Sequence, residues 1–222
     1  LGEGEKIPPQ GSWAAWRGDV ANTGLQMLPG AIIEPVHTKE IFLKGVVTGQ
    51  PVFEDLEGDG EEEMFFLDSG KVVAVNQEGN ILWTSKFILA KTIYSVEDLD
   101  NNGKKEVVVF GEKQLVILDA HTGEVLFKED FQDQVSRPRF LLHDFDKDGF
   151  KEAIIWIYSN TVLYVYKFGN DNGMFIAKRI NTIDGSMYQV EAFYPGLLYA
   201  DTNNDGYDEF VLVRYEGVSI YD

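Results

Sequence analysis

The sequence contains no cysteine, which excludes disulfide bonds, thiolate nucleophiles and cysteine-ligated zinc sites. It has only three histidines, and none of them stands in an HxH or HExxH spacing. Basic residues are few: 19 Lys and Arg oppose 37 Asp and Glu, so the formal net charge is −18. This charge excludes a nucleic-acid-binding surface and disfavours an anionic membrane as a partner. No run of about 18 apolar residues occurs, so we expect no transmembrane segment and no signal segment in this chain.

Hydrophobic residues nevertheless make up 44% of the 222 residues and aromatic residues 13%, enough to build a sizeable core. Residues 1–12 are rich in Gly, Pro and charge, and we predict a flexible tail or linker there. Residues 13–222 fit the size of one larger all-β domain.

An acidic loop containing glycine recurs four times with the same internal spacing. The copies are DLEGDGEEE from Asp55, DLDNNGKKE from Asp98, DFDKDGFKE from Asp144 and DTNNDGYDE from Asp201. Oxygen-bearing side chains stand at positions 1, 3, 5 and 9, with Gly at position 6, which is how a chain wraps a hard cation. A single copy is also typical of a plain polar turn. Four copies that all keep an acid at position 9 favour a calcium site, so we expect up to four Ca²⁺ ions.

The four loops differ in charge. The first and third carry four carboxylates each, whereas Asn102 and Asn203 replace one carboxylate in the second and fourth. Because calcium affinity depends partly on the charge of the ligands, we expect the first and third loops to bind more tightly.

The loops start at 55, 98, 144 and 201, and β-rich runs follow each of them. Periods of 43, 46 and 57 residues with several short strands predict a β-propeller with one four-stranded antiparallel blade per repeat. The repeats begin near 51, 93, 138 and 197. Each predicted blade has one strand before the loop and a second strand after it. The third strands begin at 71, 114, 161 and 217. In the first three repeats, turns at Gly79, Gly123 and Gly173 lead into a fourth strand.

The closure of the propeller has two readings. The last repeat has only three predicted strands, and the segment 39–45 precedes the first repeat without a loop of its own. This segment can complete the last blade and close a four-bladed ring. Alternatively, the four repeats are part of a larger propeller. An insertion at 183–195 lengthens the third repeat, and its aromatic residues belong either to the core, which we favour, or to a ligand platform.

The repeats resemble the FG-GAP or VCBS family, the calcium-loop β-propellers of integrin α-subunit heads and many secreted bacterial and archaeal proteins. The resemblance covers about residues 45–222, although Glu57 departs from the usual Asp, every ninth residue is Glu, and no FG-GAP dipeptide is recognisable. It implies ligands at positions 1, 3, 5, 7 (by its carbonyl) and 9 of each loop: Asp55, Glu57, Asp59, Glu61 and Glu63; Asp98, Asp100, Asn102, Lys104 and Glu106; Asp144, Asp146, Asp148, Phe150 and Glu152; Asp201, Asn203, Asp205, Tyr207 and Glu209.

Two further segments, WAAWRGDVANTG from Trp13 and VVAVNQEGNILW from Val72, are similar to quinoprotein-like propellers, a group that includes non-enzymatic scaffolds. The Arg17-Gly18-Asp19 triplet inside the first segment matches the RGD attachment motif, which we interpret as chance. We assign no catalytic residue, because no GxSxG, P-loop or GxGxxG element follows a strand. His143, beside Asp144, either supports the third loop or is simply a strand residue, and we favour the strand residue.

We interpret the chain as a non-catalytic, calcium-binding interaction or adhesion module with a polysaccharide or surface-protein partner. Calcium is plentiful outside the cell, so we expect a secreted, extracellular or periplasmic location. Two alternatives stay open: an extracellular polysaccharide-active enzyme of the lyase type, and a structural subunit that self-assembles.

Overall fold

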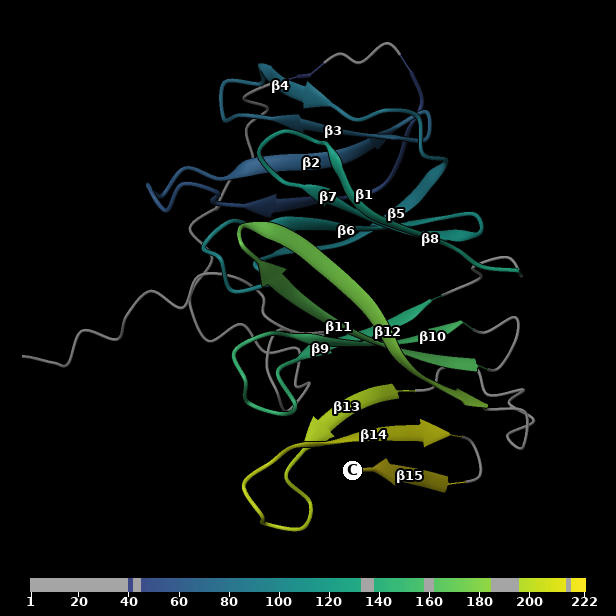
Figure 1. Cartoon of the computed structure of the whole chain (residues 1–222). Helices are drawn as coiled ribbons and strands as arrows, with labels where there is room; N and C mark the ends of the chain where they lie inside the picture. The colour runs from purple at the N-terminus through teal and green to yellow at the C-terminus, as the bar shows by residue number, and fades with distance from the viewer. Residues whose placement is uncertain (1–39, 42–44, 133–137, 158–161, 185–195, 215–216) are drawn as a thin grey trace, which may run out of the picture. The chain divides into compact units, whose positions relative to one another are not determined.

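The computed structural model describes residues 40–41, 45–132, 138–157, 162–184, 196–214 and 217–222. These residues form four antiparallel sheets and no helix (Figure 1). The strands are β1 (Val47–Glu54), β2 (Glu63–Asp68), β3 (Lys71–Val75) and β4 (Ile81–Thr84); β5 (Ala90–Glu97), β6 (Glu106–Gly111), β7 (Gln114–Asp119) and β8 (Val125–Asp130); β9 (Arg139–His143), β10 (Glu152–Ile157), β11 (Val162–Asp171) and β12 (Met174–Asp184); β13 (Gly196–Ala200), β14 (Glu209–Arg214) and β15 (Gly217–Tyr221).

Each sheet is a simple meander in which consecutive strands pair. The acidic loop joins the first strand of each sheet to the second, as the sequence predicts. The predicted third strands and the predicted fourth strands of the first three sheets are also confirmed, and the last sheet has three strands. In the third sheet β12 continues to Asp184, beyond its predicted apolar run, and pairs with β11 along its length.

The central strands are apolar at nearly every position because both of their faces are covered. In β6, Val107 and Val109 point into the core shared with the first sheet, whereas Val108 and Phe110 point into the core shared with the third sheet. The side chains of β10 alternate in the same way: Ala153 and Ile155 enter the core shared with the second sheet, and Ile154 and Trp156 enter the core shared with the fourth sheet. Alternating side chains of a single strand therefore join three successive sheets.

Neighbouring sheets contact one another in chain order, through β1 and β5, β8 and β12, and β9 and β13. No closed ring is detected among the described residues. The described strands belong to one compact unit, Ile41–Asp222. The predicted tail 1–12, the segment from Trp13 and the inserted residues 185–195 lie outside the described residues. So does most of the segment 39–45, and its role in closure stays a prediction. The described residues include no helix able to span a membrane.

The turn at Gly123 offers a test of packing between the first two sheets. Gly123 has a φ of +72°, and a Cβ there would lie 2.3 Å from the ring of Trp83, whose Nε1 donates to the carbonyl of Ala120 at 2.9 Å. We expect G123A to lower the free energy of unfolding by about 3 kcal/mol, from backbone strain and overpacking together.

The matched control is G173A, in the equivalent turn of the third sheet, where φ is +86° and no atom lies within 4 Å of the added Cβ. This variant pays only for its backbone conformation, about 1 kcal/mol. Urea unfolding measures both variants, and equal losses would contradict the close contact with Trp83.

Candidate metal centre

The four acidic loops share one hydrogen-bond pattern, which follows from their common spacing. The Asp at position 1 accepts the backbone N–H groups of positions 5 and 6, as Asp55 does from Asp59 and Gly60 at 3.2 and 2.8 Å. The other three copies repeat these two bonds. The side chain at position 5 accepts the N–H of position 7, and the Glu at position 9 accepts the N–H of position 2. The repeated acids are thus oriented by the loop itself.

Two residues of each loop have a left-handed backbone conformation, with a positive φ. Position 6 has a φ between +83° and +92° in the four copies, as its glycine predicts. Position 4 is also left-handed, which the sequence analysis missed. Its residues in three copies are Gly58, Asn101 and Asn204, the residue types that tolerate this conformation. The third copy has Lys147, with a φ of +56°.

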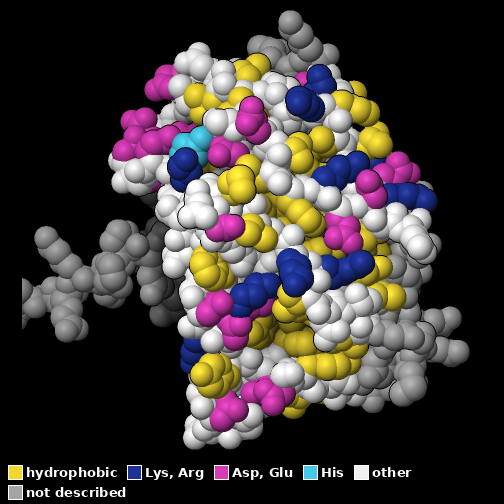
Figure 2. All heavy atoms as spheres, viewed as in Figure 1, with side chains coloured by type: hydrophobic (Ala, Val, Ile, Leu, Met, Phe, Trp, Pro, Cys, Tyr) yellow, Lys and Arg dark blue, Asp and Glu magenta, His cyan; other side chains and the backbone are white. Residues whose placement is uncertain are grey.

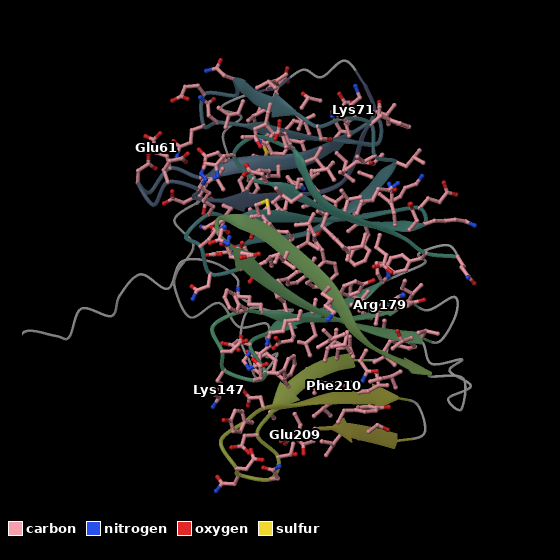
Figure 3. All side chains as sticks on the ribbon, in the orientation of Figure 1. Glu61, Lys71, Lys147, Arg179, Glu209 and Phe210 are labelled. Carbon is pink, nitrogen blue, oxygen red and sulfur yellow. The ribbon has the colours of Figure 1, made fainter. Side chains whose placement is uncertain are left out.

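Because Asn adopts a positive φ more readily than Lys, we expect K147N to raise the free energy of unfolding by about 0.5 kcal/mol. The gain is small, since Lys147 Nζ also donates to the carbonyl of Gly206 in the fourth loop and lies 5.4 Å from the ring centre of Tyr207. Figure 3 labels Lys147 beside the β13–β14 loop. The reverse change, N101K in the second loop, should be destabilising. Thermal unfolding of the two variants checks the sign, and stabilisation by N101K would contradict it.

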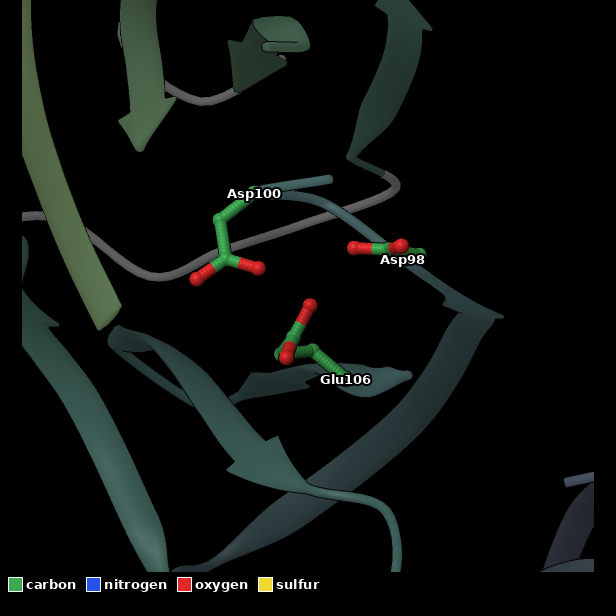
Figure 4. Close-up of side chains that lie close together, drawn as sticks. All are labelled: Asp98, Asp100 and Glu106. Atoms are coloured by element: carbon green, nitrogen blue, oxygen red, sulfur yellow. The ribbon is translucent and has the colours of Figure 1, made fainter. Parts of the chain in front are cut away.

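Three of the four loops gather their acids. In the second loop Asp98, Asp100 and Glu106 offer carboxylate oxygens that all lie within 4.8 Å of one another (Figure 4). The third and fourth loops do the same with the following acids: Asp144, Asp146 and Glu152; Asp201, Asp205 and Glu209. Acidic side chains also project on the left of Figure 2, on the side where Figure 1 draws the β1–β2 and β13–β14 loops.

The first loop has no such group among the described residues. Glu57, where the related loops have Asp or Asn, is mostly exposed, and its carboxylate lies 3.8 Å from Nε2 of His121 in the second sheet. Asp55, Asp59 and Glu63 still make the shared loop hydrogen bonds. The structure therefore preserves the loop but does not bring its predicted ligands together.

The remaining predicted ligands lie in the loops as follows. In every loop the side chain at position 5 accepts the N–H of position 7; the pairs are Asp59 with Glu61, Asn102 with Lys104, Asp148 with Phe150, and Asp205 with Tyr207. In the fourth loop the side chain of Asn203 also accepts the N–H of Asp205. The role of the seventh residues as carbonyl ligands stays a prediction, as does the predicted order of calcium affinities.

Several carboxylate oxygens in the gathered loops are buried without a hydrogen-bond partner. They are Asp100 Oδ1 in the second loop, Glu152 Oε1 in the third and Glu209 Oε1 in the fourth. The side chain of Asp100 is completely buried, while its Oδ2 accepts from Asn102 and Asn170. A buried carboxylate oxygen without a partner is costly, and a hard cation is the partner that oxygen clusters fit. The donor sets of the second and fourth loops therefore fit calcium.

Electrostatics strengthen this case in the second loop. The pKa of Glu106 is raised to about 8, chiefly by burial and in smaller part by the nearby carboxylates of Asp100, Asp98 and Asp119, while the hydrogen bond from the N–H of Leu99 opposes the shift. Burial likewise raises the pKa of Glu152 in the third loop. A divalent ion would favour the charged form of such a carboxyl group.

The third loop, which joins β9 to β10, differs from the others because a lysine of β11 contacts its acids. Lys167 Nζ, on β11, lies 2.7 Å from Asp148 Oδ2 and 3.2 Å from Glu152 Oε1, and it also pairs with Asp146. Burial alone would lower the pKa of Lys167, but its close contacts with these three carboxylates raise it above the usual value. Sequence spacing gives no sign of this contact.

Charged side chains link the second, third and fourth loops to the preceding sheet. Lys105, at position 8 of the second loop, pairs with Glu54, the residue before the first loop. In the same way Lys151 of the third loop pairs with Glu97 at 2.6 Å. In the last contact the loop supplies the carboxylate instead, since Asp208 of the fourth loop lies 2.8 Å from Nε2 of His143.

His143 is the last residue of β9, in agreement with its interpretation as a strand residue. Its ring also stacks on Tyr199 of the fourth sheet, with ring centres 3.8 Å apart. The residue therefore belongs to the contact between the third and fourth sheets.

No protein-family model and no curated protein sequence matches the chain. Among solved structures, an exotype rhamnogalacturonan lyase is similar, with 18% identity and a TM-score of 0.52 over 79% of this chain and 40% of the lyase. Weaker likenesses are the V. cholerae biofilm matrix protein Bap1 (18% identity, TM-score 0.45, 73% of this chain and 23% of Bap1) and the WD40 domain of SCAP from fission yeast (11%, 0.44, 78% and 42%). The chain thus shares its fold with part of the lyase and spans 40% of the lyase's length.

Proposed function

We propose that the chain is a calcium-stabilised, propeller-like interaction module of the FG-GAP or VCBS type. The observation that carries the proposal is the set of buried carboxylate oxygens without partners, Asp100 Oδ1 in the second loop and Glu209 Oε1 in the fourth. A bound ion supplies positive charge and oxygen coordination at these points.

The residues of the chain would use such an ion to fix the path between two strands. Asp98 and Asp201 already hold the backbone N–H groups of their loops, and Glu106 and Glu209 stand at the start of the second strand. An ion shared by these acids joins the first strand of a sheet to the second. The ion pair between Lys151 and Glu97 then connects the second loop to the third.

Calcium titration of decalcified protein tests this role. We expect binding in wild type and the loss of one site in each of E106Q and E209Q, because a neutral amide is a poorer calcium ligand. E57Q in the first loop is the matched control and should keep the wild-type number of sites. Absence of calcium binding in wild type would refute the proposal.

For the partner we propose a polysaccharide or a surface protein outside the cell. The fold shared with an exotype rhamnogalacturonan lyase supports a polysaccharide, and the acidic calcium loops suit a secreted or periplasmic location. Retention on a panel of polysaccharides, with calcium and with chelator, tests this. Calcium-dependent retention of one polysaccharide supports the proposal, whereas defined oligomers without retention would favour a self-assembling structural subunit.

The same lyase likeness motivates a second candidate, an enzyme acting on polysaccharides. A lyase forms a new carbon–carbon double bond at the cleaved end, so ultraviolet absorbance of a retained polysaccharide separates the candidates. An absorbance that increases with time in calcium, but not in chelator, would favour the enzyme. A polysaccharide that is retained without any increase in absorbance favours the binding module.

A further inference from the structure

The third loop carries its own cation. Lys167 Nζ contacts three of its acids, Asp146, Asp148 and Glu152, at the place where their carboxylates converge. Asp146 and Glu152 are two of the three acids gathered in this loop. The side chain of Lys167 is about one quarter exposed, so its ammonium group is only partly hydrated there.

Strand register shows why only this loop has such a group. Lys167 lies directly opposite Glu152 in the pairing of β10 with β11. In the second sheet the residue opposite Glu106 is Asp119, which adds a negative charge. In the first and fourth sheets the pairings Met64 with Val75 and Phe210 with Tyr221, continued by one residue, lead to Asn76 and Asp222. Lysine thus stands at this register position in one sheet out of four.

We infer that the ammonium group of Lys167 takes the place of calcium in the third loop, so that the chain binds two calcium ions, in the second and fourth loops. The inference rests on the proposed calcium-binding function. A monovalent ammonium on a flexible stem can neutralise the gathered acids but repels a divalent ion a few ångströms away. The third loop, with four carboxylates, then binds calcium more weakly than the second and fourth, contrary to the order that its charge count alone predicts.

The two loops that bind differ from the third in the partner of their buried acids. Asp100 Oδ1 and Glu209 Oε1 have no partner at all, whereas Glu152 Oε1, although it accepts no hydrogen bond, lies 3.2 Å from the ammonium group. The first loop is not gathered and is not expected to contribute a tight site.

The test is calcium stoichiometry by isothermal titration calorimetry on decalcified protein. We expect two sites in wild type and three in K167M, which keeps the apolar stem of the side chain and removes its charge. Calcium affinity of the third loop should rise on the order of tenfold or more. The matched control is K178M, which removes a lysine from the facing position of β12, where Lys178 is exposed, and should leave two sites.

A second variant keeps the inference testable if K167M does not fold. D148N removes a predicted ligand of the third loop and should leave two sites, because that loop takes no calcium in the wild-type chain. Three sites in wild type, two sites in K167M or one site in D148N would each overturn the inference and leave the proposed function standing. Absence of binding in wild type and K167M would instead refute the proposed function itself.

Discussion

Calcium at about 100 times its dissociation constant should raise the free energy of unfolding by about 5 kcal/mol over that of the chelated protein. An ion that binds only the folded chain contributes about 2.7 kcal/mol per site at this excess. Two independent sites, in the second and fourth loops, therefore add to about twice that value. Urea unfolding followed by tryptophan fluorescence measures the difference, since Trp156 is buried between the third and fourth sheets.

Site variants show whether the stabilisation comes from the gathered loops. E209Q should lose about half of the calcium effect, and E106Q with E209Q nearly all of it. E57Q, in the first loop, should keep the full effect. Unfolding midpoints that agree within error in calcium and in chelator would contradict a structural role for the ion.

Calcium-free protein should become less stable as the pH rises from about 5 to about 8. Glu106 is 2% exposed, and its pKa in the folded chain is about 8. In the unfolded chain the group returns to its ordinary value of 4.5. Between these values the folded state holds a proton that the unfolded state has lost, so stability falls as pH rises. At about 1.4 kcal/mol per pKa unit, the total loss is on the order of 5 kcal/mol.

The variant E106Q separates this effect from others. Its side chain is neutral at every pH, so the calcium-free variant should be more stable than wild type at pH 8.5 and similar to it at pH 4.5. With saturating calcium at pH 8.5 the order should reverse, because the variant lacks one calcium ligand. E63Q, at the same position of the first loop, is the control and should keep the wild-type slope. Urea unfolding at several pH values provides the measurement. If the free energy of unfolding of the calcium-free wild type does not change between pH 5 and pH 8, the raised pKa of Glu106 is contradicted.

The strands could be predicted from the sequence because the physical causes are local or repeated. Runs such as EVVVF and QLVILD are continuous in hydrophobicity since their side chains enter cores on both faces of the sheet. The loop geometry was also predictable, because Asp at position 1 and Gly at position 6 act within nine residues.

The differences between the loops could not be predicted, because they depend on residues far away in the sequence. Lys167 enters the third loop from 15 residues beyond Glu152, through strand register rather than motif spacing. Glu57 turns toward His121 of another sheet instead of joining its own loop. Counting carboxylates along the chain therefore predicted the same charge for two loops that the folded chain treats differently.

The ion pairs between successive sheets give the repeats a fixed order. Lys105 and Lys151 each meet a glutamate of the preceding repeat, but Asp208 meets His143. Placing the fourth repeat directly after the second would set Asp208 against Glu97, two like charges, and placing a copy of the third after itself would set a lysine against His143. The repeats are alike in backbone yet not freely exchangeable, so an engineer who shuffles or extends this array would have to match the charges at each junction.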